Sequence, residues 1–218
     1  MSRAVRRQSI PSRAEIEAQN RRRRMAVGIS VGVLAAVILT AVILASRVPK
    51  AASDAPIKAT IAVGQKAPDF SVSTTAGPFQ LSSAAGKPTL LEVFASWCPH
   101  CQHEVPILDK IATAYKNKVN IVAVSGSPYG MDSSTPETQA DVVSFMEKFG
   151  VTYPVAFDPE LDVAKKYLQG GFPTVVLIGA DGTIQAIRDG EIPPADITAS
   201  LNASIAGKKP DPAMGLKS

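Results

Sequence analysis

Cysteine and histidine are scarce in this sequence of 218 residues, which contains two of each and a single tryptophan. All five lie in the stretch "ASWCPHCQH", residues 95–103, so no cysteine or histidine elsewhere can complete a metal site or form a second disulfide. The sequence also has no internal repeat, which excludes a repeat array. The cluster remains open to three interpretations: a metal site, a disulfide that braces a loop, or a redox couple.

Basic charge is concentrated at one end of the chain. The formal net charge is +4, but residues 1–24 contain eight arginines against Glu15 and Glu17, which leaves the remainder slightly acidic. A nucleic-acid-binding domain would carry Lys and Arg over a folded face, interleaved with aromatic residues. The sequence therefore predicts no nucleic-acid partner.

Charged residues are absent from residues 25–46, which as a helix would span roughly 33 Å, enough for a hydrocarbon core of about 30 Å. Four arginines at 21–24 precede this run, whereas Arg47 and Lys50 alone follow it closely. Because positive charge stays on the cytoplasmic side, we predict a basic cytoplasmic tail at 1–24, one transmembrane signal-anchor helix and an extracytoplasmic C-terminal domain in a bacterial cell membrane. A cleaved secretory signal is the alternative. A twin-arginine export signal is disfavoured, because "RRQSI" lies well before the apolar run.

The composition of the chain after residue 46 predicts a linker, one folded domain and a disordered tail. Residues 47–62, rich in Ala, Ser, Lys and Pro, are predicted to be a flexible linker. Hydrophobic residues at 45% and charged residues at 19% suit one globular domain, expected at residues 63–206. The tail "GKKPDPAMGLKS", residues 207–218, is expected to be disordered because it offers nothing to bury.

The expected domain alternates strand-like and helix-like segments. The apolar run "PTLLEVFAS", residues 88–96, is typical of a buried central strand, and a helix follows it. Another helix is expected to open with Thr135, Pro136 and Glu137 and to end at Gly150. Further strands are expected in "VNIVAVSG" and "YPVAFD", a helix in "PELDVAKKYL", a hairpin in "PTVVLIGADGTIQAIRDG" and a last helix at 194–206. This order predicts an α/β sheet with helices on both faces.

The two cysteines have the spacing Cys-X-X-Cys at the point where the predicted strand gives way to a helix. At a helix N-terminus, unpaired backbone N–H groups and the macrodipole stabilise a thiolate. We therefore predict that Cys98 is the attacking thiolate and that Cys101, one turn later, is the resolving thiol. A purely structural disulfide is the alternative, although so short a bridge constrains the unfolded chain very little.

Several segments in a fixed order carry a family resemblance: "APDFSV", "GPFQLSSAAGKPTLLEVFASWCPHC", "GFPTVVLI" and a later "DG". Over roughly residues 63–206 the chain resembles the membrane-anchored thioredoxin-like thiol–disulfide oxidoreductases of the TlpA/ResA (redoxin) family. This group includes the cytochrome c maturation thioredoxins. The resemblance implies a thioredoxin-like fold with an N-terminal β-hairpin extension and an inserted strand–helix unit at 125–168.

The same resemblance implies partners and cofactors. The expected substrates are envelope proteins that bear cysteines or disulfides. The expected redox partner is a membrane electron donor or acceptor of the CcdA/DsbD or quinone-linked kind. A monomer is expected, with no metal and no cofactor beyond the redox-active Cys98–Cys101 disulfide.

Resemblance also assigns roles around the cysteines. Pro173 matches the cis-proline beside the active-site disulfide, the alternative being an ordinary proline at a strand edge. Phe172 would present backbone groups to an extended substrate peptide, and Trp97 would pack beside the motif and shape the docking surface. These two residues are therefore the expected substrate-binding residues.

Two acidic residues are also assigned by resemblance. Glu92 aligns with the buried acid of thioredoxin, which exchanges protons with the resolving cysteine, and burial would raise its pKa toward neutrality. The alternative places Glu92 at a sheet edge, facing solvent. Glu104 matches an acidic residue near the active site of the ResA type, or else is a plain first-turn glutamate favoured by the helix dipole.

The dipeptide between the cysteines bears on the direction of electron flow. Pro99-His100 is the dipeptide of the strongly oxidising DsbA-type proteins, in which a histidine that stabilises the thiolate makes the disulfide a better oxidant. The domain architecture favours a reductase instead, for example in cytochrome c maturation. We predict a reductase, with a DsbA-like oxidase or isomerase as the alternative.

Two other functional classes have less support. A copper-binding or delivery module could use Cys98 and Cys101, with His100 and His103, as soft ligands. Copper chaperones of this fold, however, use Cys-X-X-X-Cys and a distant histidine, which this chain lacks. A peroxiredoxin would need Thr or Ser where Ala95 stands.

Overall fold

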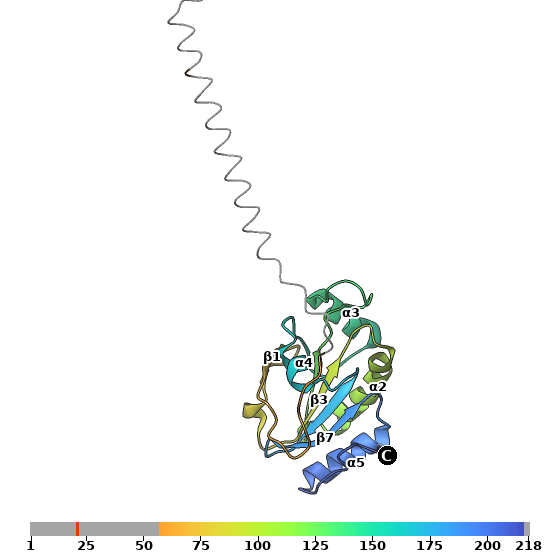
Figure 1. Ribbon diagram of the computed structural model, residues 1–218. Coiled ribbons are helices and arrows are strands. Elements are labelled where there is room, and N and C mark those ends of the chain that lie inside the picture. Colours follow the sequence, from red (N-terminus) through yellow and green to blue (C-terminus); the bar gives the residue numbers. More distant parts are fainter. Residues whose placement is uncertain (1–20, 22–56, 216–218) are drawn as a thin grey trace, which may run out of the picture. The chain divides into compact units, whose positions relative to one another are not determined.

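The computed structural model describes residue 21 and residues 57–215 (Figure 1). The predicted cytoplasmic tail other than Arg21, the predicted transmembrane helix and most of the predicted linker lie outside the described residues. Among the residues that are described, no helix is both long enough and apolar enough to cross a membrane.

Residues 57–215 contain a seven-stranded sheet with the order β2-β1-β5-β4-β3-β6-β7. The central strand β3 runs parallel to β4 and antiparallel to β6, and all six of its residues are buried. The hairpin β1–β2 adds to the sheet through β5. The strands are β1 (Ser71–Thr74), β2 (Gly77–Gln80), β3 (Thr89–Phe94), β4 (Asn120–Ser125), β5 (Val155–Phe157), β6 (Thr174–Ile178) and β7 (Ile184–Asp189).

Helices cover both faces of the sheet, with α4 on one side of β3 and α2 and α5 on the other (Figure 1). One core cluster joins Leu108 of α2, Phe145 of α3 and Leu201 of α5. The opposite cluster joins Tyr167 of α4 to Phe70, which precedes the hairpin. The helical elements are η1 (Ser82–Ala84), α2 (Pro99–Ala114), α3 (Gln139–Phe149), α4 (Asp162–Tyr167) and α5 (Pro194–Ile205).

The order of strands and helices confirms the predicted α/β sheet with helices on both faces, and the β6–β7 hairpin occupies the expected segment. The β1–β2 hairpin lies at the N-terminal side of the domain, as the resemblance implies. The segment expected as an insertion, residues 125–168, contains α3, β5 and α4.

The predicted start of α3 is wrong. The helix begins at Gln139 with Thr138 as its N-cap, because Thr138 and Asp141 form a capping box. The Thr138 hydroxyl accepts from the Asp141 N–H at 3.3 Å, and the Asp141 carboxylate accepts from the Thr138 N–H at 2.8 Å. Glu137 is thereby left outside the helix. The predicted end is confirmed, with Gly150 in the left-handed region at φ 71°.

The folded domain extends beyond both ends of the range predicted for it, residues 63–206. The segment after α5, predicted to be disordered, packs against β7: Met214 is fully buried, and the Arg188 guanidinium donates to the Ala213 and Met214 carbonyls at 3.4 Å. At the other end, the Ala59 N–H donates to the Leu168 carbonyl at 2.6 Å. A few apolar side chains and backbone hydrogen bonds hold these segments, Ile57 and Ile61 at one end and Met214 at the other, which composition alone does not reveal.

Candidate functional site

The Cys-X-X-Cys segment occupies the junction between β3 and α2. Cys98 is the N-cap of α2, in an extended conformation, and Pro99 is the first helical residue. Proline suits this position because its missing N–H would have no partner in the first turn. The Gln102 N–H donates to the Cys98 carbonyl at 3.1 Å, which closes the first turn around the two cysteines. The predicted strand-to-helix junction is therefore confirmed.

Both cysteine side chains are buried, and as free thiols they differ in acidity. A hydrogen bond from the Cys101 thiol is the main cause that lowers the pKa of Cys98 to about 6, with help from the backbone N–H groups of Cys101 and His100. Burial raises the pKa of Cys101 far above the usual range, so this sulfur keeps its proton. At neutral pH the pair is thus a thiolate next to a thiol, which fits the attacking and resolving roles.

The loop before β6 faces the attacking sulfur. The Phe172–Pro173 peptide bond is cis, as the resemblance implies, and the Phe172 carbonyl oxygen lies 3.5 Å from the Cys98 sulfur. The Trp97 and Phe172 rings meet edge to face, with centroids 6.0 Å apart. The Trp97 indole N–H donates to the Ser127 hydroxyl at 2.8 Å. Two partly exposed aromatic side chains therefore flank Cys98, as expected of a docking surface.

Glu92 lies in the middle of β3, between Ala123 of β4 and Val175 of β6, and is 4% exposed. Its position excludes the alternative in which it faces solvent at a sheet edge. Burial is the main cause that raises its pKa, and repulsion from Glu104 and Cys98 adds to the effect. In return, the charge of Glu92 raises the pKa of Cys101. The carboxyl group and the resolving thiol are therefore electrostatically linked.

Glu104 is buried on α2, with 1% exposure, and so is not a plain surface glutamate of the first turn. Neither carboxylate oxygen has a hydrogen-bond partner of normal geometry among the residues that the structure describes. Burial raises the pKa of Glu104 to about 8, although the backbone of Ile192 opposes the shift. At neutral pH this buried group holds a proton for most of the time.

Sequence reasoning missed the role of a third acid near the site, Glu137, which is partly buried. Its carboxylate accepts hydrogen bonds from the Ser96 hydroxyl at 2.7 Å and from the Ser125 hydroxyl. Ser96 belongs to the loop before Cys98 and Ser125 ends β4, and both serines are fully buried. Burial raises the pKa of Glu137 to about 7. The only signal in the sequence is the Thr138-X-X-Asp141 capping box, which places Glu137 outside α3 and free to turn inward.

Replacing Glu137 with alanine should lower the free energy of unfolding by about 2 kcal/mol, because two buried hydroxyl groups lose their acceptor. Chemical denaturation at pH 8 measures this loss. The matched control is Glu147→Ala, at an exposed position of α3, which should stay within about 0.5 kcal/mol of the native chain. Equal stability of the two variants would contradict the role given to Glu137.

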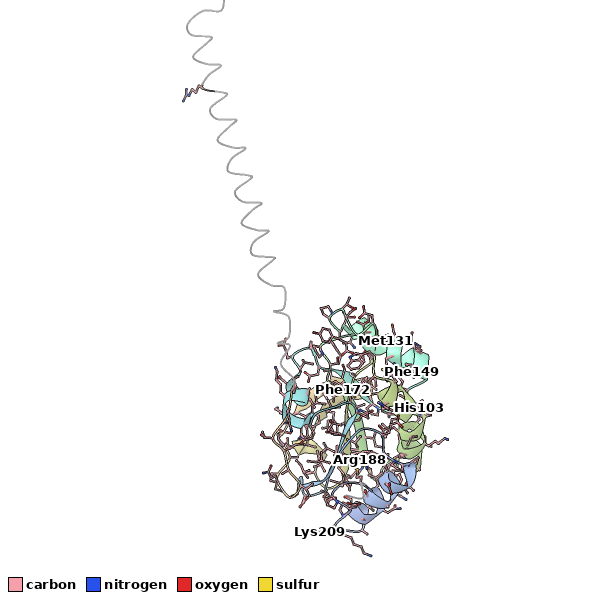
Figure 2. The ribbon with its side chains drawn as sticks, turned by 45° about the vertical axis from the view of Figure 1, so that its right-hand side comes forward. His103, Met131, Phe149, Phe172, Arg188 and Lys209 are labelled. Atoms are coloured by element: carbon pink, nitrogen blue, oxygen red, sulfur yellow. The ribbon has the colours of Figure 1, made fainter. Side chains whose placement is uncertain are left out.

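Both histidines turn toward one acid, Glu191. The Glu191 carboxylate lies 2.7 Å from the His100 ring and 3.6 Å from the His103 ring. His103 projects from the surface of α2 (Figure 2), with its side chain 85% exposed. Within residues 57–215 and at residue 21, no group of three or more His, Cys, Asp or Glu side chains is arranged to hold a metal ion.

Comparisons with known proteins agree with the chemistry of this site. The Redoxin family model matches residues 62–203. The thiol-disulfide oxidoreductase ResA of Geobacillus kaustophilus is 32% identical over 148 residues, which cover 67% of this chain and 80% of ResA.

Solved structures of two other proteins have a similar fold. A thiol:disulfide interchange protein of the thioredoxin family from Chlorobium tepidum is 27% identical, with a TM-score of 0.52 over 67% of this chain and 99% of that one. A secreted Mycobacterium tuberculosis disulfide oxidoreductase, homologous to E. coli DsbE, is 25% identical, with a TM-score of 0.51 over 62% of this chain and 95% of that one. The predicted thioredoxin-like fold is therefore confirmed for the folded domain.

Proposed function

We propose, from the premise that this chain belongs to the Redoxin family and is a protein-disulfide oxidoreductase, that it reduces disulfides of envelope proteins. The observation that carries disulfide exchange is the difference in acidity within the pair: Cys98 has a pKa of about 6 at the N-terminus of α2, and Cys101 keeps its proton. The domain architecture and the similarity to ResA support reduction as the direction. No further cofactor is needed, because the dithiol itself carries the two electrons.

The reaction begins with attack of the Cys98 thiolate on a substrate disulfide. One substrate sulfur leaves as a thiolate, which takes a proton, and the other is held in a mixed disulfide with Cys98. Cys101 then loses its proton, attacks the Cys98 sulfur and releases the second substrate thiol. Glu92, whose pKa is raised by burial, accepts the proton of Cys101 in this proposal. The substrate gains two electrons and two protons, and the enzyme is left with a Cys98–Cys101 disulfide.

The substrate and the location are further parts of the proposal. An extended peptide with a disulfide would lie between Trp97 and the loop that carries Phe172, close to the Cys98 sulfur. The apolar run at residues 25–46 would anchor the chain in the membrane and keep the folded domain on the extracytoplasmic side. Electrons would then come from a membrane donor of the CcdA/DsbD kind, and apocytochrome c is a suitable substrate class.

The redox state of the cysteine pair in living cells tests the proposed direction. Cells that express the full chain are quenched with acid, and free thiols are alkylated before electrophoresis. A reductase supplied with electrons across the membrane should be found mostly as dithiol. If most of the chain carries the disulfide, the second candidate, a DsbA-like oxidase, is correct instead. The Pro99-His100 dipeptide and the low pKa of Cys98 are the observations that favour this candidate.

A further inference from the structure

Glu191 belongs to the loop between β7 and α5, yet it reaches the first turn of α2. Its Oε1 atom lies 2.7 Å from Nδ1 of His100, the residue between the two cysteines. The Arg188 guanidinium donates to the backbone carbonyl of Glu191 at 3.1 Å and helps to hold this loop in place. A residue 91 positions away in the sequence thus contacts the dipeptide that is expected to tune the redox potential.

The charged groups around this contact are few. His100 interacts with Glu191 and with the Cys98 thiolate, and Glu191 also interacts with His103 at 3.6 Å. The charges also act on buried Glu104: the charge of Glu191 raises the pKa of Glu104, and the charge of Arg188 lowers it. The one acid in direct contact with the ring of His100 is therefore Glu191, among the described residues.

We propose that Glu191 is the counter-ion of His100, and that the pair as a unit determines how this dipeptide acts on the Cys98 thiolate. An unpaired imidazolium would stabilise the thiolate and with it the reduced enzyme. An imidazolium paired with a carboxylate carries no net charge, so its effect on the thiolate is weaker. Glu191 is thus a positioning and tuning residue that touches no substrate.

Electrostatics at the site agree with this geometry. The hydrogen bond to Glu191 is the main cause that raises the pKa of His100, and the same contact lowers the pKa of Glu191. The contact therefore favours the ionised form of both partners. Among the groups that lower the pKa of Cys98, the charge of His100 ranks below the hydrogen bonds from Cys101 and from the backbone.

This inference rests on the proposed function and deepens it. When the Cys98–Cys101 disulfide takes two electrons and one proton from a donor dithiol, the S–S bond breaks and leaves a thiolate on Cys98 and a thiol on Cys101. Any group that stabilises this thiolate makes the disulfide a stronger oxidant. Glu191 offsets the charge of the His100 imidazolium. The disulfide is therefore a weaker oxidant than it would be beside an unpaired imidazolium, which at an ordinary pKa of about 6.5 predominates below neutral pH. This favours a reductase.

A double-mutant cycle on the full chain in detergent tests the pairing, with the acid dissociation constant of Cys98 as the readout. It is measured from the pH dependence of alkylation between pH 4 and 8. Glu191→Gln leaves an unpaired imidazolium near pH 6 and should increase the constant about threefold. His100→Gln leaves an unpaired carboxylate and should decrease it by a similar factor. In the chain with both substitutions, the acid dissociation constant of Cys98 should be close to the native value.

The histidine titration gives a second readout. The chain has only two histidines, so their ring signals are easily assigned by NMR with the help of His103→Gln. In Glu191→Gln, the pKa of His100 should fall toward the ordinary value of about 6.5, while Glu147→Gln on α3 should leave it unchanged.

Two results would overturn the inference: an unchanged His100 titration in Glu191→Gln, or a Cys98 constant that moves in the same direction in both single variants. Neither measurement needs a substrate or an electron donor. A chain found mainly as disulfide in cells would therefore reject the reductase function and leave the pairing of Glu191 with His100 to be judged by these titrations.

Discussion

Replacing Cys98 with serine should lower the rate of disulfide exchange at least about a thousandfold, whereas replacing Cys101 with serine should stop the reaction at a mixed disulfide. The two variants should differ because Cys98 is the thiol that is ionised near neutral pH, and its sulfur lies beside the Phe172 carbonyl in the expected docking surface. Without Cys101, nothing resolves the adduct. Exchange with a chromogenic disulfide gives the rates, and mass spectrometry of the full chain detects the adduct.

The pH dependence adds a further check on this prediction. The pKa of Cys98 is lowered to about 6, so the thiolate fraction and the rate of attack should rise as the pH increases from 5 to 7 and then level off. The double variant, with serine at both positions, is the control for adduct formation and should form none. A mixed disulfide on Cys101 in the Cys98→Ser chain would show that the roles are reversed.

Replacing Glu104 with glutamine should make the reduced protein more stable at alkaline pH by about 3 kcal/mol and leave it nearly unchanged at pH 5. In the folded state the pKa of this carboxyl is raised to about 8 from an ordinary 4.5, so folding favours its protonated form. The stability that it contributes is complete below its unfolded pKa and is lost as the pH rises through about 8. Glutamine mimics the protonated acid at every pH and should remove this loss.

Urea unfolding of the two chains at pH 5, 7 and 9 measures the difference. Because each comparison is made at one pH, the titration of Cys98 largely cancels between the two chains. Glu147→Gln is the matched control, since this exposed side chain should change the unfolding free energy by less than about 0.5 kcal/mol at each pH. A constant difference between native and Glu104→Gln chains from pH 5 to 9 would contradict a buried, proton-binding Glu104.

Local patterns in the sequence were sufficient to predict the core of the site. The β3 strand is an unbroken apolar run, and the helix that follows it opens with Cys98 and Pro99, so the positions of both cysteines follow from neighbouring residues alone. The burial of Glu92 was predicted through resemblance and is found in the structure.

Contacts between distant segments could not be predicted in the same way. Glu191 approaches His100 only because β7 returns along the sheet to the end where α2 begins, and no spacing in the sequence records that proximity. The sequence places Glu137 in a helix start because Thr135, Pro136 and Glu137 form a typical helix opening. Thr138 is an equally good cap by residue type. Only the reciprocal hydrogen bonds between Thr138 and Asp141 show which threonine caps the helix.

The ordered segment after α5 has a consequence for association between chains. β7 is the last strand of the sheet, and an uncovered outer strand is a template on which another chain can add. The Ile187 N–H donates to the Pro212 carbonyl at 3.0 Å, and the burial of Met214 holds this cover in place. The residues after α5 therefore help to keep the outer side of β7 from pairing with strands of other molecules.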